Sequence, residues 1–70
     1  MAGPVAAEQR LINDIARQFH HLPAAEATAA IAGHVERFWD PRMRARLLTL
    51  VDRQVEPLDP LAIAAAELIR

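Results

Sequence analysis

The chain has no cysteine, no serine and no tyrosine, and each absence removes a class of chemistry. Without cysteine there is no disulfide, no iron–sulfur ligation and no thiol catalysis. The two threonines, Thr28 and Thr49, have no recognisable base near them in the sequence, and the carboxylates are scattered over faces that we expect to be exposed. A chain this short also has little volume for a pocket of about 300 Å³ or more. We therefore expect no catalytic residue in this chain, and we do not expect the chain to act as an enzyme by itself.

Lysine is absent as well, so all eight basic residues are arginines, and nine acids give a formal net charge of −1. This balance provides no strong attraction to a phosphate backbone, so nucleic acid is not an expected partner. The first residues lack the basic-then-apolar pattern of a signal peptide. No apolar run approaches the roughly 18 residues of a membrane span. The sequence predicts a cytoplasmic protein that does not contact a membrane.

Three histidines are present, but their spacing does not indicate a metal site. His20 and His21 are adjacent, so on a helix they point about 100° apart, and His34 falls on another segment. There is no Glu-x-x-His or His-x-x-x-His spacing and no cysteine to complete a zinc site. We expect surface or boundary histidines and no metal-binding or cofactor-binding residue. Near a helix end, protonated His20 and His21 would favour the helix dipole.

Helical spacing of apolar residues recurs along the whole chain, whereas no segment alternates apolar and polar residues over the length of a strand. Seventy residues, 15 of them alanine, predict one small all-α domain over residues 1–70, a bundle of three to four short helices with a thin core. The first helix would bury one side, formed by Val5, Ile12, Ile15, Ala16, Phe19 and Leu22.

The second segment, about residues 24–39, places Phe38 in line with a stripe that we expect to pack in the core; the other members are Ala27, Ile31 and Val35. Gly33 in mid-helix costs about 1 kcal/mol relative to alanine. Two explanations for a glycine here are open: another helix approaches closely at this position, or the helix simply tolerates the cost.

Two Asp-Pro pairs, at 40–41 and 59–60, predict the starts of two more helices, because Asp is a favoured N-cap and Pro is favoured at the first helical position. The helix from 41 to about 55 would bury Met43, Leu47, Leu50 and Val51. The last helix, about 60–69, would bury Leu61, Ala65, Leu68 and Ile69. A helix this short is marginal alone, so it must dock on its own chain or on a partner.

The stretch "ERFWDPRMR" (36–44) carries the candidate binding residues. Helical projection gathers Arg42, Arg46 and Arg53 on one edge, which indicates a solvated ridge that pairs with acids such as Glu36 or Glu56.

Arg44 falls instead on the apolar side of the same helix. Either its aliphatic stem packs on neighbouring residues while its guanidinium reaches water, or the side chain enters a protein interface. Trp39 either caps the core or stands as an exposed interface anchor.

The string "IAGHVERFWDPRMRARLL" (31–48) resembles the signature region of the delta subunit of cytosolic NAD-dependent, molybdenum-containing formate dehydrogenases. "LINDIARQF" (11–19) is similar to the N-terminal helix of that family, and "LDPLAIAAAEL" (58–68) to its C-terminal segment. The resemblance covers nearly the whole chain in the same order. The Phe-Trp-Asp-Pro-Arg-Met-Arg string is its most specific part.

The resemblance implies a non-catalytic accessory subunit of a formate dehydrogenase complex. The chain would carry no cofactor, whereas partner subunits would hold a molybdenum pterin cofactor, iron–sulfur clusters, FMN and NAD. It would bind the large catalytic subunit and support assembly, cofactor insertion or stability. The residues expected to contact that partner are Phe38, Trp39, Arg42, Met43, Arg44 and Arg46.

The alternative hypothesis is a small helical DNA-binding or regulatory protein that uses the 41–55 helix for recognition. The arginine edge supports it. The net charge of −1, the absence of lysine and the scarcity of polar base-reading side chains on that helix oppose it.

Overall fold

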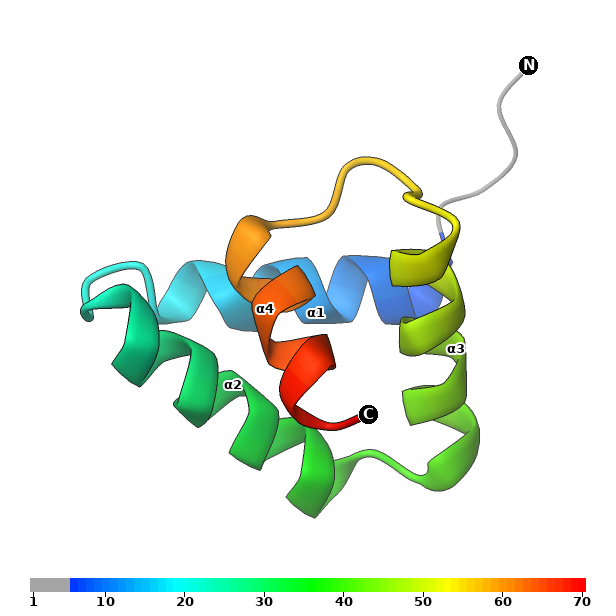
Figure 1. Ribbon diagram of the computed structural model, residues 1–70, viewed down its shortest axis with the longest axis horizontal. Coiled ribbons are helices and arrows are strands. Elements are labelled where there is room, and N and C mark those ends of the chain that lie inside the picture. Colours follow the sequence, from blue (N-terminus) through cyan, green and yellow to red (C-terminus); the bar gives the residue numbers. More distant parts are fainter. Residues whose placement is uncertain (1–5) are drawn as a thin grey trace.

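Four helices make up most of residues 6–70, the part of the chain that the computed structural model describes (Figure 1). They are α1 (Ala7–Gln18), α2 (Ala24–Phe38), α3 (Pro41–Asp52) and α4 (Pro60–Leu68). The described residues form no strand, and the all-α class expected from the sequence is confirmed. Val5, which was expected on the first buried stripe, lies outside the described residues.

Both Asp-Pro pairs begin helices as expected. Asp40 Oδ1 accepts a hydrogen bond from the backbone N–H of Met43 at 2.9 Å, and Asp59 Oδ1 accepts one from the N–H of Leu61 at 2.9 Å. Each carboxylate thus satisfies a donor that has no partner inside the helix. The following prolines occupy the first helical positions, where a missing N–H costs nothing.

The end of α3 comes earlier than the sequence predicted, because the chain reverses in a left-handed turn at Gln54. The φ angle of Gln54 is 55°. Its N–H donates to the carbonyl of Val51 at 3.0 Å, and the N–H of Val55 donates to the carbonyl of Leu50 at 3.1 Å. These two bonds form a Schellman motif, which usually carries glycine at the left-handed position.

All four helices contribute to the core, and α2 and α4 share the most extensive helix–helix contact. Much of it consists of small side chains, since α4 contributes three buried alanines and α2 two; the buried alanines on these two helices are Ala27, Ala32, Ala62, Ala65 and Ala66. Small residues let two helices approach closely. The larger fully buried side chains are Ile12, Ile31, Val35 and Leu47, supplied by α1, α2 and α3.

The last helix therefore docks on its own chain, but its buried side differs from the expected one. Leu68, predicted in the stripe, is 60% exposed, whereas Ala62 and Ala66 are buried. The close contact with α2 turns the alanine side of α4 inward and leaves Leu68 on the outer edge at the helix end. Leu61 and Ile69 are partly buried against the core.

Polar side chains of α1 and of the turn that follows it hold the segment that precedes α4. Gln9 Nε2 and Asn13 Nδ2 both donate to the carbonyl of Pro57 at 2.9 Å. Asn13 Oδ1 accepts from the N–H of Asp59 at 2.8 Å, and His20 Nε2 lies 2.6 Å from Asp59 Oδ2. These contacts join positions 39–48 residues apart and fix where α4 begins.

Gly33 does not mark a close helix contact. A Cβ atom at this position would meet nothing within 4 Å, and the residue is exposed. Of the two explanations, simple tolerance is the one that fits. None of the described helices is both long and apolar enough to cross a membrane.

Candidate interaction surface at the α2–α3 corner

The candidate residues lie where α2 ends and α3 begins, and residues 37–46 are called the corner below. The chain leaves α2 at Trp39, whose φ and ψ of −93° and 136° are extended, and Asp40 continues in an extended conformation. The N–H of Trp39 still donates to the carbonyl of Val35 at 2.9 Å. The capping bond of Asp40 then starts α3 at once. Two ordered helix ends therefore fix the corner from both sides.

The corner exposes Phe38 and buries Trp39, the reverse of what was expected for Phe38. Phe38 is 66% exposed, although the sequence predicted that it packs in the core. Trp39 is 6% exposed and belongs to the main core cluster. Phe38 is the last helical residue and lies on the predicted side of α2, but no element of residues 6–70 covers it there. Trp39 is no longer helical, and its side chain packs in the core. Of the two interpretations of Trp39, core packing is therefore the one that agrees with the structure.

Phe38 is in contact with one other aromatic side chain. The rings of His34 and Phe38 have centroids 4.8 Å apart and are tilted by 42°, as expected for side chains four residues apart on a helix. His34 is half-buried. The contact orients the Phe38 ring without covering it.

The arginines of the corner differ in their surroundings. Arg42 and Arg46 are exposed, as predicted for a ridge, and Arg44 is half-buried. Arg46 does not pair with Glu36 or Glu56, because its Nη1 lies 3.2 Å from Oε2 of Glu8 on α1. That carboxylate is itself 9% exposed, so the expectation that all carboxylates lie on exposed faces is wrong for Glu8.

Three arginines near the corner have no acidic partner within residues 6–70, namely Arg37, Arg42 and Arg44. The other paired arginines lie elsewhere: Arg17 with Asp14 at 3.6 Å, and Arg70 with Asp52 and Glu67. The hydrogen bonds that the Arg70 guanidinium donates to these two carboxylates, chiefly to Asp52, raise the pKa of Arg70. The corner is thus a region of unbalanced positive charge in a chain whose net charge is −1.

Met43 is partly buried against the core and lies on the first turn of α3. The six predicted contact residues therefore share one corner but have three surroundings. Phe38, Arg42 and Arg46 are exposed, Met43 and Arg44 are half-buried, and Trp39 is buried.

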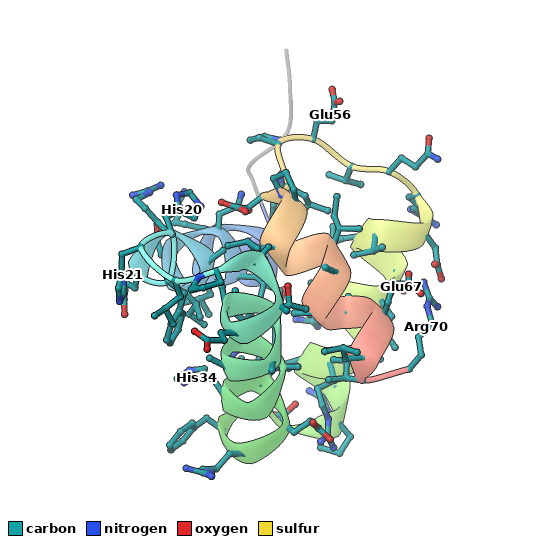
Figure 2. The ribbon with its side chains drawn as sticks, turned by 60° about the vertical axis from the view of Figure 1, so that its left-hand side comes forward. His20, His21, His34, Glu56, Glu67 and Arg70 are labelled. Carbon is teal, nitrogen blue, oxygen red and sulfur yellow. The ribbon has the colours of Figure 1, made fainter. Side chains whose placement is uncertain are left out.

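Within residues 6–70 no three side chains of the His, Cys, Asp or Glu type come together as a metal site would need. His20 and His21 are exposed near the end of α1, and His34 lies apart from them on α2 (Figure 2). His20 Nε2 contacts the carboxylate of Asp59, the N-cap of α4.

A cleft of about 390 Å³ lies at the other end of α3, larger than the sequence led us to expect. Its lining residues are Val51, Gln54, Val55, Glu56, Leu58 and Ile63. Glu56 is the only ionisable residue among them, and its carboxylate points away from the body of the molecule (Figure 2). The cleft is set between α3, α4 and the segment that joins them, away from the corner.

The fold and the corner define a small all-α protein with a basic and aromatic surface between its second and third helices. A comparison with protein families matches residues 10–66 to the NADH-dependent formate dehydrogenase delta subunit, FdsD, and the chain belongs to this family. The family is the one that the sequence resembled, and its name makes the chain a subunit of a formate dehydrogenase. Comparisons with curated proteins and with solved structures found no match.

Proposed function

We propose that the chain is a non-catalytic accessory subunit, which binds the large molybdenum-containing subunit of a cytoplasmic formate dehydrogenase through the corner. In that role it supports assembly, cofactor insertion or stability of the complex. The molybdenum pterin cofactor, the iron–sulfur clusters, FMN and NAD would all reside in partner subunits. The family supports membership of the complex, and the exposure of Phe38 is the observation that supports the corner as the contact.

Phe38 continues a buried stripe past the point where other residues of the range 6–70 cover it. Ala27, Ile31 and Val35 are each 0% exposed, and Phe38 follows three residues later on the same side of α2. At 66% exposure the ring leaves apolar surface in water. Burying such a side chain fully is worth about 1.5–3 kcal/mol. A partner that covers the end of the stripe would gain part of this free energy.

Trp39 supports the proposed contact from within the core. Its burial and the capped start of α3 hold the backbone between Phe38 and Arg42, so the two exposed side chains are presented without a large loss of conformational entropy on binding. Trp39 is thus proposed as a supporting residue of the contact, with Met43 beside it at the edge of the core.

Of the two interpretations of Arg44, a packed stem with its guanidinium in water or a place in a protein interface, we propose the interface. It is half-buried and has no acidic partner within residues 6–70, and arginine is enriched at protein interfaces. Arg46 is already held by Glu8, which leaves less of its charge available. The same contact removes one of the three arginines on which the DNA-binding alternative depends, and we do not propose that function.

The test is co-purification of the tagged chain with the catalytic subunit. Phe38→Ala is expected to weaken association about tenfold or more. Leu11→Ala, which removes a 43% exposed leucine from α1, is the matched control and should leave association unchanged. Formate-dependent NAD reduction and molybdenum content should fall when the chain is deleted. Normal binding by Phe38→Ala, or unchanged activity and molybdenum content after deletion, would refute the proposal.

A further inference from the structure

After Phe38, the most exposed large apolar side chain among residues 6–70 is Leu68, at the end of another helix. Leu68 is 60% exposed and lies at the last position of α4, as Phe38 does on α2. Both views show α2 and α4 running in the same general direction, with α3 beginning where they end (Figures 1 and 2). The C-terminal ends of α2 and α4 and the N-terminus of α3 therefore face the same end of the bundle.

The charge at this end is also one-sided. Arg37, Arg42 and Arg44 have no acidic partner within residues 6–70. Two acids lie among them: Asp40 is engaged as the N-cap of α3, and Glu36 is exposed beside Arg37 without an ion pair, so positive charge remains in excess. By contrast, the arginine nearest Leu68, Arg70, is held by Asp52 and Glu67, and Figure 2 shows Arg70 beside Glu67. The uncompensated positive charge thus lies on the α2–α3 side of the bundle end.

We infer that the bundle end formed by Phe38, Leu68, Arg42 and Arg44 binds a segment of the catalytic subunit whose apolar side chains are flanked by Asp or Glu residues. This inference rests on the proposed function and specifies the partner chemistry. The apolar side chains of the segment would cover Phe38 and Leu68. Its carboxylates would meet the guanidinium groups, which bind carboxylates in a two-pronged geometry. A basic segment would meet an excess of positive charge and be repelled.

The surface would therefore be wider than the corner, because it reaches onto the last turn of α4. That extension gives Leu68 a reason to remain outside the core. The alanine side of α4 packs on α2, and the leucine at its end stays free for a second chain. The short last helix would in this way serve both its own bundle and the interface.

Two variants test the inference in the chain co-expressed with the catalytic subunit. Leu68→Asp is expected to weaken association at least tenfold, because it places a carboxylate where the apolar contact and the acidic segment should meet. The double variant Arg42→Glu/Arg44→Glu should weaken it at least as strongly. Its matched control is Arg10→Glu/Arg53→Glu, which makes the same charge change at two arginines that have no acidic partner within residues 6–70. This control should bind like the wild type.

Salt dependence of the wild-type complex provides a readout that does not depend on the folding of any variant. Association through uncompensated arginines should weaken severalfold between about 0.05 and 0.3 M NaCl, as screening shortens the reach of the charges. The acidic-segment inference is wrong if Leu68→Asp and the Arg42/Arg44 variant bind normally and salt has no effect on association. In that case, failure of Phe38→Ala to bind would still support the corner contact. If Phe38→Ala also binds normally, both are wrong.

Discussion

Gly33 occupies the middle of a fifteen-residue helix without a packing reason for being glycine. A Cβ there would meet no atom within 4 Å. Gly33→Ala is therefore expected to raise the free energy of unfolding by about 0.5–1 kcal/mol, since glycine loses more backbone freedom in a helix than alanine does. For a domain this small, 1 kcal/mol corresponds to a rise in the melting temperature of about 4–8 °C. Thermal unfolding followed by circular dichroism measures it.

The reverse substitution on the same helix is the control. Ala29 is exposed on α2, and Ala29→Gly should lower the melting temperature by a similar amount. A melting temperature that falls on Gly33→Ala would show that the glycine is needed for a contact outside residues 6–70.

Gln54 has the left-handed conformation that closes α3, with φ of 55°. For a residue with a Cβ this conformation costs roughly 1–2 kcal/mol, whereas glycine adopts it freely. Gln54→Gly should therefore stabilise the protein, by about 0.5–1 kcal/mol after the extra chain freedom of glycine in the unfolded state is counted. Urea denaturation gives the difference from the shift in midpoint.

Gln54→Ala separates the backbone effect from loss of the side chain. Alanine retains the Cβ, so its stability should stay close to that of the wild type. Equal stabilisation by alanine and glycine would mean that the glutamine side chain, rather than the left-handed backbone, is unfavourable. Gln54 also lines the cleft at this end of α3, and neither variant is expected to alter association at the corner.

At the scale of the elements, Asn13 is the residue that places α4. Its amide donates to the carbonyl of Pro57 and accepts from the N–H of Asp59, the residue that caps α4. Asn13→Ala leaves the part-buried N–H of Asp59 without its acceptor, which costs about 1–3 kcal/mol. We expect this loss in the free energy of unfolding, together with faster amide hydrogen exchange at Asp59.

Asp14 provides the neighbouring control on α1. Its carboxylate is 53% exposed and lies 3.6 Å from Arg17, so Asp14→Ala should change stability by no more than about 0.5 kcal/mol. If Asn13→Ala is as mild as Asp14→Ala, the joint between α1 and the segment before α4 does not depend on this amide.

Both Asp-Pro helix starts could be predicted from the sequence because capping is local. The donor of each capping bond lies two or three residues from its acceptor. The bonds of Gln9 and Asn13 could not be predicted, since their partners lie 44–48 residues away. No spacing rule within a helix points to such a contact, and the same is true of the pairing between Arg46 and Glu8.

At the scale of the whole molecule, Trp39 is the largest apolar side chain in the core, and the core has few large members. Trp39→Ala should cost about 3–5 kcal/mol. A domain of this size has only about that much stability in total. The isolated variant is therefore expected to be largely unfolded at 25 °C, which circular dichroism and the loss of a cooperative thermal transition would show.

Phe38→Ala is the contrasting variant, since it removes an exposed ring from the adjacent position. Its stability should differ from that of the wild type by less than about 0.5 kcal/mol. Trp39→Phe retains most of the apolar volume and should fold. A cooperative transition near the wild-type temperature in Trp39→Ala would contradict the assignment of Trp39 to the core.

The sequence by itself determined the all-α class, the two Asp-capped helix starts, the buried side of α2 up to Val35 and the family. These features depend on interactions within a few residues or on the order of residue types, which one chain displays directly. The tertiary structure decided which members of each predicted stripe are buried. Phe38 lies on the predicted side of α2 yet is exposed, because no other element of residues 6–70 covers the end of that helix. Leu68 is exposed because the side of α4 that packs on α2 is the alanine side, which differs from the predicted one. Periodicity gives the direction of a side chain, whereas burial depends on where the neighbouring helices stop.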